Sequence, residues 1–164
     1  MKNKKLIVIC AEIILAIVAF VLLIATASVK YTFTLLNNTS VTSISGIEGI
    51  FGNDSLSAVW TGILSFIFMI VALVILLCLC VLSLLKKKFK LAGICKFVAA
   101  GLLIVAGIFI FFEVAAFKSV NGDASFSIGS NGGSYSLGIG WIISAILSIA
   151  AGGLSCAEAF ILEK

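Results

Sequence analysis

The stretch AVWTGILSFIFMIVALVILLCLCVLSLLKKKFK, residues 58–90, decides the fold class of this chain. Its apolar part, 58–85, has no charged residue, and a helix of that length at ~1.5 Å per residue exceeds the ~30 Å hydrocarbon core of a bilayer. A backbone inside lipid must satisfy its own hydrogen bonds, so we expect this run to be a transmembrane helix. The lysines of 86–90 then mark one membrane boundary.

The rest of the chain has the same character. Three further apolar runs are long enough to cross a bilayer: 6–29, 91–117 and 139–162. Hydrophobic residues make up 62% of the 164 residues and charged residues 11%, against roughly 25% charged in soluble domains. We therefore predict one membrane domain over 1–164, an all-α membrane fold built as a four-helix transmembrane bundle.

The positions of the lysines predict the topology. Lys2, Lys4, Lys5, Lys86, Lys87, Lys88, Lys90 and Lys164 fall on one side of the four runs, and Lys30 and Lys118 fall on the other. By the positive-inside rule both termini are cytoplasmic, and the loops 30–57 and 118–138 are extracellular, in an integral plasma-membrane protein. Trp60 and Trp141 lie near the N-terminal ends of two of the spans, at the predicted outer boundary, where amphipathic rings prefer to lie.

The first span has an alternative interpretation as a signal peptide. It begins with lysines and ends in Ala25-Thr26-Ala27, which is typical of a cleavage site. Its apolar run is, however, longer than the ~7–15 residues of a signal peptide, and this favours an uncleaved membrane helix.

The second outer loop contains a hairpin pattern, SFSIGSNGGSYSL at 125–137. Serine alternates with apolar residues on both sides of Asn131-Gly132, a dipeptide favoured in two-residue turns. A turn at these residues pairs Phe126 with Leu137 and Ile128 with Tyr135. Such pairs place the large apolar side chains on one face of the hairpin.

The first outer loop shows a weaker strand pattern. Residues 31–35 alternate, and Asn37-Asn38 is a candidate turn toward 41–44. We therefore expect a small extracellular β-hairpin or sheet made from both loops, with disorder of the loops as the alternative.

Four spans with such loops resemble the claudin-like tetraspan membrane proteins, whose two outer loops together form a small sheet. The resemblance covers the whole chain in topology and implies an adhesive or barrier role. The family's signature Gly-Leu-Trp and cysteine pair is missing from the first loop, so no functional residue is carried over.

Three charged residues lie at a similar depth inside the predicted cytoplasmic half of the spans: Glu12, Lys96 and Glu158. Charges at this depth usually pair with one another or face a cavity. We expect an ion pair between Glu12 and Lys96 with Glu158 nearby, acting as a structural clamp or as part of a proton or ion path. The alternative is that the lysine stem carries its amine back to water.

The fourth span carries a small residue at every fourth position: Gly140, Ser144, Ser148, Gly152 and Cys156. Small residues at this spacing allow helix backbones to approach closely in lipid. We therefore expect a helix contact face, used inside the bundle or, alternatively, against a partner protein.

The sequence predicts no enzyme, no cofactor and no metal site. It lacks histidine, arginine and any phosphate-binding loop, and its five cysteines lie near the cytoplasmic ends of the spans, where no disulfide is expected. Without arginine we expect no nucleic-acid partner; the partners are the lipid bilayer and either another membrane protein or a second copy. The residue usage suggests a bacterial source. We predict a non-catalytic tetraspan protein with a structural, interaction or envelope role, or alternatively a small transporter or channel component that uses the Glu/Lys layer.

Overall fold

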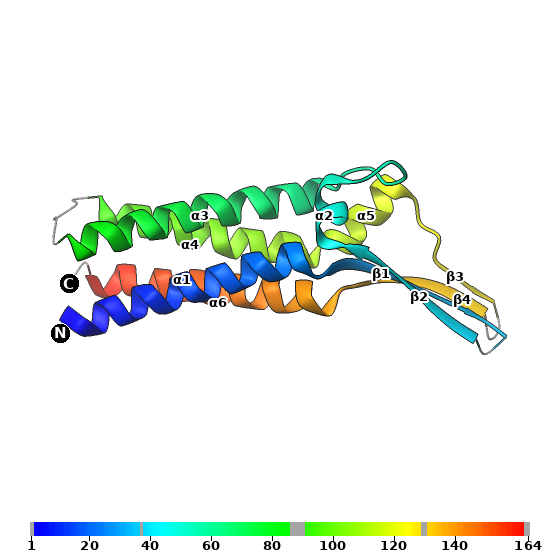
Figure 1. Ribbon diagram of the computed structural model, residues 1–164, viewed down its shortest axis with the longest axis horizontal. Coiled ribbons are helices and arrows are strands. Elements are labelled where there is room, and N and C mark those ends of the chain that lie inside the picture. The colour runs from blue at the N-terminus through cyan, green and yellow to red at the C-terminus, as the bar shows by residue number, and fades with distance from the viewer. Residues whose placement is uncertain (1, 37, 86–90, 129–130, 163–164) are drawn as a thin grey trace.

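The computed structural model describes residues 2–36, 38–85, 91–128 and 131–162 (Figure 1). The helices are α1 (Lys2–Ala25), α2 (Gly46–Phe51), α3 (Trp60–Leu84), α4 (Ala92–Phe111), α5 (Glu113–Asn121) and α6 (Ile139–Leu162). The strands are β1 (Ala27–Leu35), β2 (Asn38–Ser45), β3 (Phe126–Ile128) and β4 (Asn131–Leu137).

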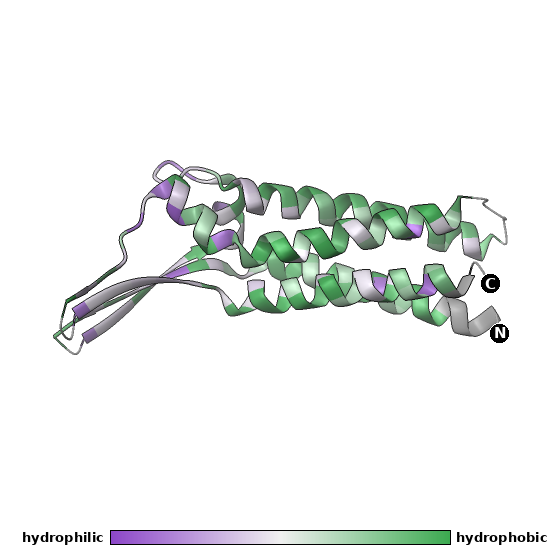
Figure 2. Cartoon of the chain, turned by 180° about the vertical axis from the view of Figure 1, so that it is seen from behind, coloured by the Kyte–Doolittle hydropathy of each residue, from purple (hydrophilic) through white to green (hydrophobic). Residues whose placement is uncertain are grey.

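Four long helices form the bundle. Helix α1 packs against α3 and α6, and α4 packs against the same two helices, so the four surround a common core. Each contains an apolar segment long enough to cross a membrane. Large apolar side chains such as Ile14, Val74 and Ile146 point outward, and Figure 2 shows hydrophobic residues along the length of the bundle. The prediction of a four-helix bundle with four apolar helices is confirmed.

Glycines set the contact between α4 and α6. A Cβ added at Gly152 would lie 2.8 Å from the carbonyl oxygen of Ala100, and one added at Gly107 would lie 2.8 Å from that of Ala145. Each helix therefore supplies a glycine where the other backbone comes close, which is the packing that small residues permit in lipid.

The four strands form one antiparallel sheet in the order β2-β1-β4-β3, which extends away from one end of the bundle (Figure 1). We call this the sheet end and the opposite one the terminal end. The two central strands continue the chain from α1 and into α6, which pack on each other, and Tyr31 of β1 pairs with Tyr135 of β4. The expected sheet from both loops is therefore present.

The predicted position of the second hairpin turn is wrong. Ile128 pairs with Asn131 and Phe126 with Gly133, so Asn131 and Gly132 are residues of β4, and neither Phe126–Leu137 nor Ile128–Tyr135 is a pair. Residues 129–130 lie outside the described residues. The observed register places the Phe126 ring beside the side-chain-free Gly133, where an added Cβ would lie 3.0 Å from Phe126 Cε1. In that position the ring packs on Phe33, with 5.9 Å between ring centroids.

Two predicted spans were too long. Helix α1 ends at Ala25 rather than 29, and the predicted span 91–117 is divided at Phe112 into α4 and α5. Apolar residues that follow the ends of α1 and α4 form a second small core near the base of the sheet, in which Val29 and Phe117 are buried.

The two tryptophans have different environments within the bundle. Trp60 is 52% exposed, but Trp141 is fully buried and its Nε1 donates to the Leu23 carbonyl at 2.8 Å. Trp141 therefore joins α6 to α1.

Candidate functional site

Three helices bring charged side chains together inside the terminal half of the bundle. Lys96 of α4 forms an ion pair with Glu158 of α6. Glu12 of α1 accepts a hydrogen bond from the hydroxyl of Ser155, 3.0 Å away. Ser155 and Glu158 are three residues apart on α6, a spacing that places both side chains on one helix face. We call these four residues the buried charge cluster.

The cluster is closed off from the molecular surface. Glu12 is fully buried, and Lys96 and Glu158 are 3% and 6% exposed. The three residues meet as the sequence predicted from their depth, but the direct ion pair of Lys96 is with Glu158 instead of Glu12. Depth along a helix follows from counting residues, whereas the direction in which each helix faces depends on the packing. Ser155 was not singled out as a partner, although its spacing from Glu158 was a usable signal.

A second buried carboxylate lies at the sheet end. Glu113, the first residue of α5, is fully buried and accepts a hydrogen bond from the Thr61 hydroxyl. Thr61 lies in the first turn of α3, where free backbone N–H groups favour a negative charge. Gly62 makes room for the carboxylate, since an added Cβ would lie 3.2 Å from Glu113 Oε1.

The small-residue stripe of α6 contacts two different helices. Ser144 donates to the Ala19 carbonyl of α1 and Ser148 to the Leu103 carbonyl of α4, both at 2.7 Å. Of the glycines, Gly140 lies against Thr26, just beyond α1, and Gly152 against Ala100 of α4. Cys156 is only partly buried. These contacts lie inside the bundle, so the stripe joins α6 to its neighbours.

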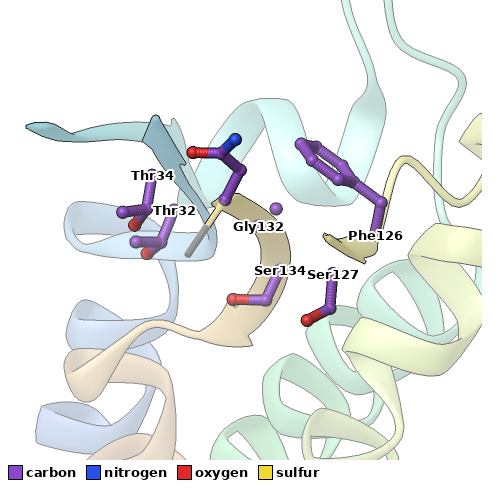
Figure 3. Close-up of a pocket in the computed structure, with 8 residues that line it drawn as sticks. Thr32, Thr34, Phe126, Ser127, Gly132 and Ser134 are labelled. Carbon is purple, nitrogen blue, oxygen red and sulfur yellow. The ribbon is translucent and has the colours of Figure 1, made fainter. Parts of the chain in front are cut away.

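The sheet has two chemically different faces. On one face the rings of Tyr31 and Tyr135 pack in a tilted arrangement with 4.8 Å between centroids, and Tyr135 also packs against Phe117 of α5. On the other face side chains with hydroxyl groups border a shallow hollow of about 380 Å³ (Figure 3). Its lining residues are Thr32, Thr34, Phe126, Ser127, Asn131, Gly132, Gly133 and Ser134. One face is thus covered in part by α5, and the other is open.

Within residues 2–36, 38–85, 91–128 and 131–162 no group of three His, Cys, Asp or Glu side chains is placed to hold a metal ion. The five cysteines, Cys10, Cys78, Cys80, Cys95 and Cys156, are free thiols.

Comparison of the chain with known families and with curated proteins gives no match to a family model or to a curated sequence. The functional argument therefore depends on the chemistry of the sheet and of the buried charge cluster.

Proposed function

We propose that this chain is a non-catalytic, four-span integral membrane protein with cytoplasmic termini, which presents its four-stranded sheet outside a bacterial cell to bind another protein. The observation that carries the proposal is the outer edge of the sheet, strand β2. Side chains 38–43 of this strand are exposed, and β2 has a neighbouring strand on only one side.

The composition of β2 makes this edge open to pairing. Soluble proteins usually protect edge strands with lysine, proline or a bulge in the strand. The sequence of β2, NTSVTSIS, has no charged residue and no proline. Val41 in its middle is 57% exposed. An extended segment of a partner can add to such an edge through backbone hydrogen bonds, with side-chain contacts supplying specificity.

The apolar side chains at the tip of the sheet favour the same role. Leu36, which follows β1, is 74% exposed, and Ile128, the last residue of β3, is 72% exposed. The sheet carries these strand ends away from the bundle (Figure 1). Large apolar side chains gathered on a projecting element are typical of a contact surface. The resemblance to claudin-like proteins agrees with an adhesive role, although no residue of that family's motif supports it.

The alternative, a transporter or channel component, is favoured by the buried charge cluster but not by the middle of the bundle. Between this cluster and Glu113 the core consists mainly of fully buried apolar side chains such as Met69, Leu103 and Ala106. The buried hydroxyls of Ser65 and Ser148 in this region are bonded to backbone carbonyls and leave no continuous polar path. Conduction needs polar groups along the path. We therefore place the interaction role first.

Photo-crosslinking in native membranes tests this proposal. A photoreactive residue at Val41 should give a protein adduct of one discrete mass, whereas the same residue at Val74, equally exposed on α3, should react with lipid. Introducing the edge charge Thr39→Lys should abolish the Val41 adduct, because a charged edge strand resists pairing. A Val41 probe that gives no protein adduct, or one unaffected by Thr39→Lys, would contradict the proposal.

A further inference from the structure

The buried charge cluster contains one more acidic group than basic groups. Its ionisable members are Glu12, Lys96 and Glu158, from α1, α4 and α6. The fourth helix, α3, has no Asp, Glu, Lys or Arg between Trp60 and Leu84, and its titratable side chains are the thiols of Cys78 and Cys80. With every carboxyl group ionised, the cluster would therefore carry a net charge of −1.

The hydrogen bonds assign the surplus charge to Glu12. The carboxylate of Glu158 is compensated by the ammonium group of Lys96. Glu12 has one oxygen bound to the Ser155 hydroxyl, while its other oxygen, Oε1, is buried without a hydrogen-bond partner. A buried charge without compensation is strongly unfavourable, and such groups usually become neutral instead.

The two carboxyl groups are also close to each other. Ser155, which binds Glu12, lies one helical turn from Glu158 on the same face of α6, and the unbonded oxygens of both carboxyl groups are buried there. Carboxyl groups that share a site in this way do not both ionise, because each negative charge opposes the other.

We propose that Glu12 and Glu158 form a binding site for one exchangeable proton, held beside the Lys96 ammonium group and the Ser155 hydroxyl. The proton neutralises Glu12 and supplies the hydrogen that joins the two carboxyl groups. This site does not depend on the proposed role of the sheet, because it lies among the helices and uses none of the sheet residues.

A proton fits the cluster better than a metal cation. Hard cations require about six oxygen ligands. The cluster offers two carboxylates and one hydroxyl, and the neighbouring ammonium group repels a second cation. Loss of the proton would leave two negative carboxylates facing each other between α1 and α6. The bound proton therefore helps to hold these helices together.

Infrared difference spectroscopy of the full chain in lipid vesicles, titrated with acid and base, measures the proposed proton directly. A Glu113→Gln background removes the other buried carboxyl group, which would give a similar signal. In that background we expect the carbonyl band of a protonated carboxylic acid, lost in one step as the pH rises. In the Glu12→Gln variant this band should be absent throughout the neutral pH range, because Glu158 stays ionised in its ion pair with Lys96.

Lys96→Met provides the opposite change with a side chain of similar length. Without the ammonium group, loss of the protonated-acid band should move to higher pH, because the positive charge that stabilises the carboxylates is removed. Helical circular dichroism shows whether each variant is folded, and the titration of the Glu113→Gln protein does not depend on any cluster variant. Absence of a protonated-acid band above pH 5 in that protein would overturn the proposal. Displacement of the band by sodium or lithium ions at constant pH would also overturn it, in favour of a cation site.

Discussion

Adding one methyl group at Gly152 should weaken the bundle, whereas adding one at the next residue should not. A Cβ at Gly152 would lie 2.7 Å from Ile104 Cγ1 and 2.8 Å from the Ala100 carbonyl oxygen. Backbone atoms of α4 cannot move aside without separating the helices. At Gly153 an added Cβ meets nothing within 4 Å, so Gly153→Ala is a matched control in the same turn of α6.

The expected size of the effect follows from the difference between the two variants. Replacing glycine by alanine in a helix gains up to ~1 kcal/mol through backbone entropy, and this gain is common to both positions. Forcing an extra carbon into a packed contact costs ~1–3 kcal/mol. The Gly152→Ala protein should therefore be about 1–3 kcal/mol less stable than the Gly153→Ala protein.

Reversible unfolding in mixed micelles, followed by helical circular dichroism, measures this difference in the free energy of unfolding. If the stabilities of the two variants agree within ~0.5 kcal/mol, α4 and α6 are not in close backbone contact at Gly152, and the glycine-based account of their packing is refuted.

Three further predictions concern other contacts. Lys96→Met alone should cost ~3–5 kcal/mol because it leaves a buried carboxylate uncompensated, and the double variant with Glu158→Gln should recover part of that loss in a double-mutant cycle of unfolding free energies. Trp141→Phe should cost ~0.5–1.5 kcal/mol in the same assay through loss of its hydrogen bond to α1. Hydrogen bonds from Ser45 lower the pKa of Glu48, so the stabilisation of α2 is present above the ordinary carboxyl range and is lost as the pH falls through the lowered pKa. The protection factors of the α2 amides, which correct for the intrinsic pH dependence of exchange, should fall in acid, and Ser45→Ala should reduce this pH dependence.

Hydropathy predicted the helices well inside the bundle and less well where the chain leaves the bundle. The predicted run 139–162 has the bounds of α6, and 58–85 differs little from α3. The predicted spans 6–29 and 91–117 were too long at their sheet ends, because Val29 belongs to β1 and Phe117 to α5, and both side chains are buried in the second small core. Composition does not distinguish an apolar residue of a long bundle helix from one in the small core near the sheet, because both side chains are hydrophobic.

The strand alternation was also more informative than the turn signal. Moving the second hairpin turn from Asn131-Gly132 shifts the pairing of β3 with β4 by an even number of residues, so each side chain stays on its predicted face. The turn dipeptide is a local preference. The observed register depends on contacts with the neighbouring strand β1, where Phe33 packs on Phe126, and no local signal contains that information.

The buried charge cluster shows what can be predicted by counting residues along the helices of an apolar bundle. Counting residues from the terminal end predicted that Glu12, Lys96 and Glu158 share a layer, and they do meet. Their pairing depends on the rotation of each helix about its axis, and in apolar helices nearly every face is hydrophobic, so periodicity gives little information on that rotation. The hydroxyl of Ser155 resolves the arrangement, because it binds Glu12 from the same α6 face that presents Glu158 to Lys96. Polar side chains that bind across helices, even uncharged ones, are therefore the better guide to how such helices face one another.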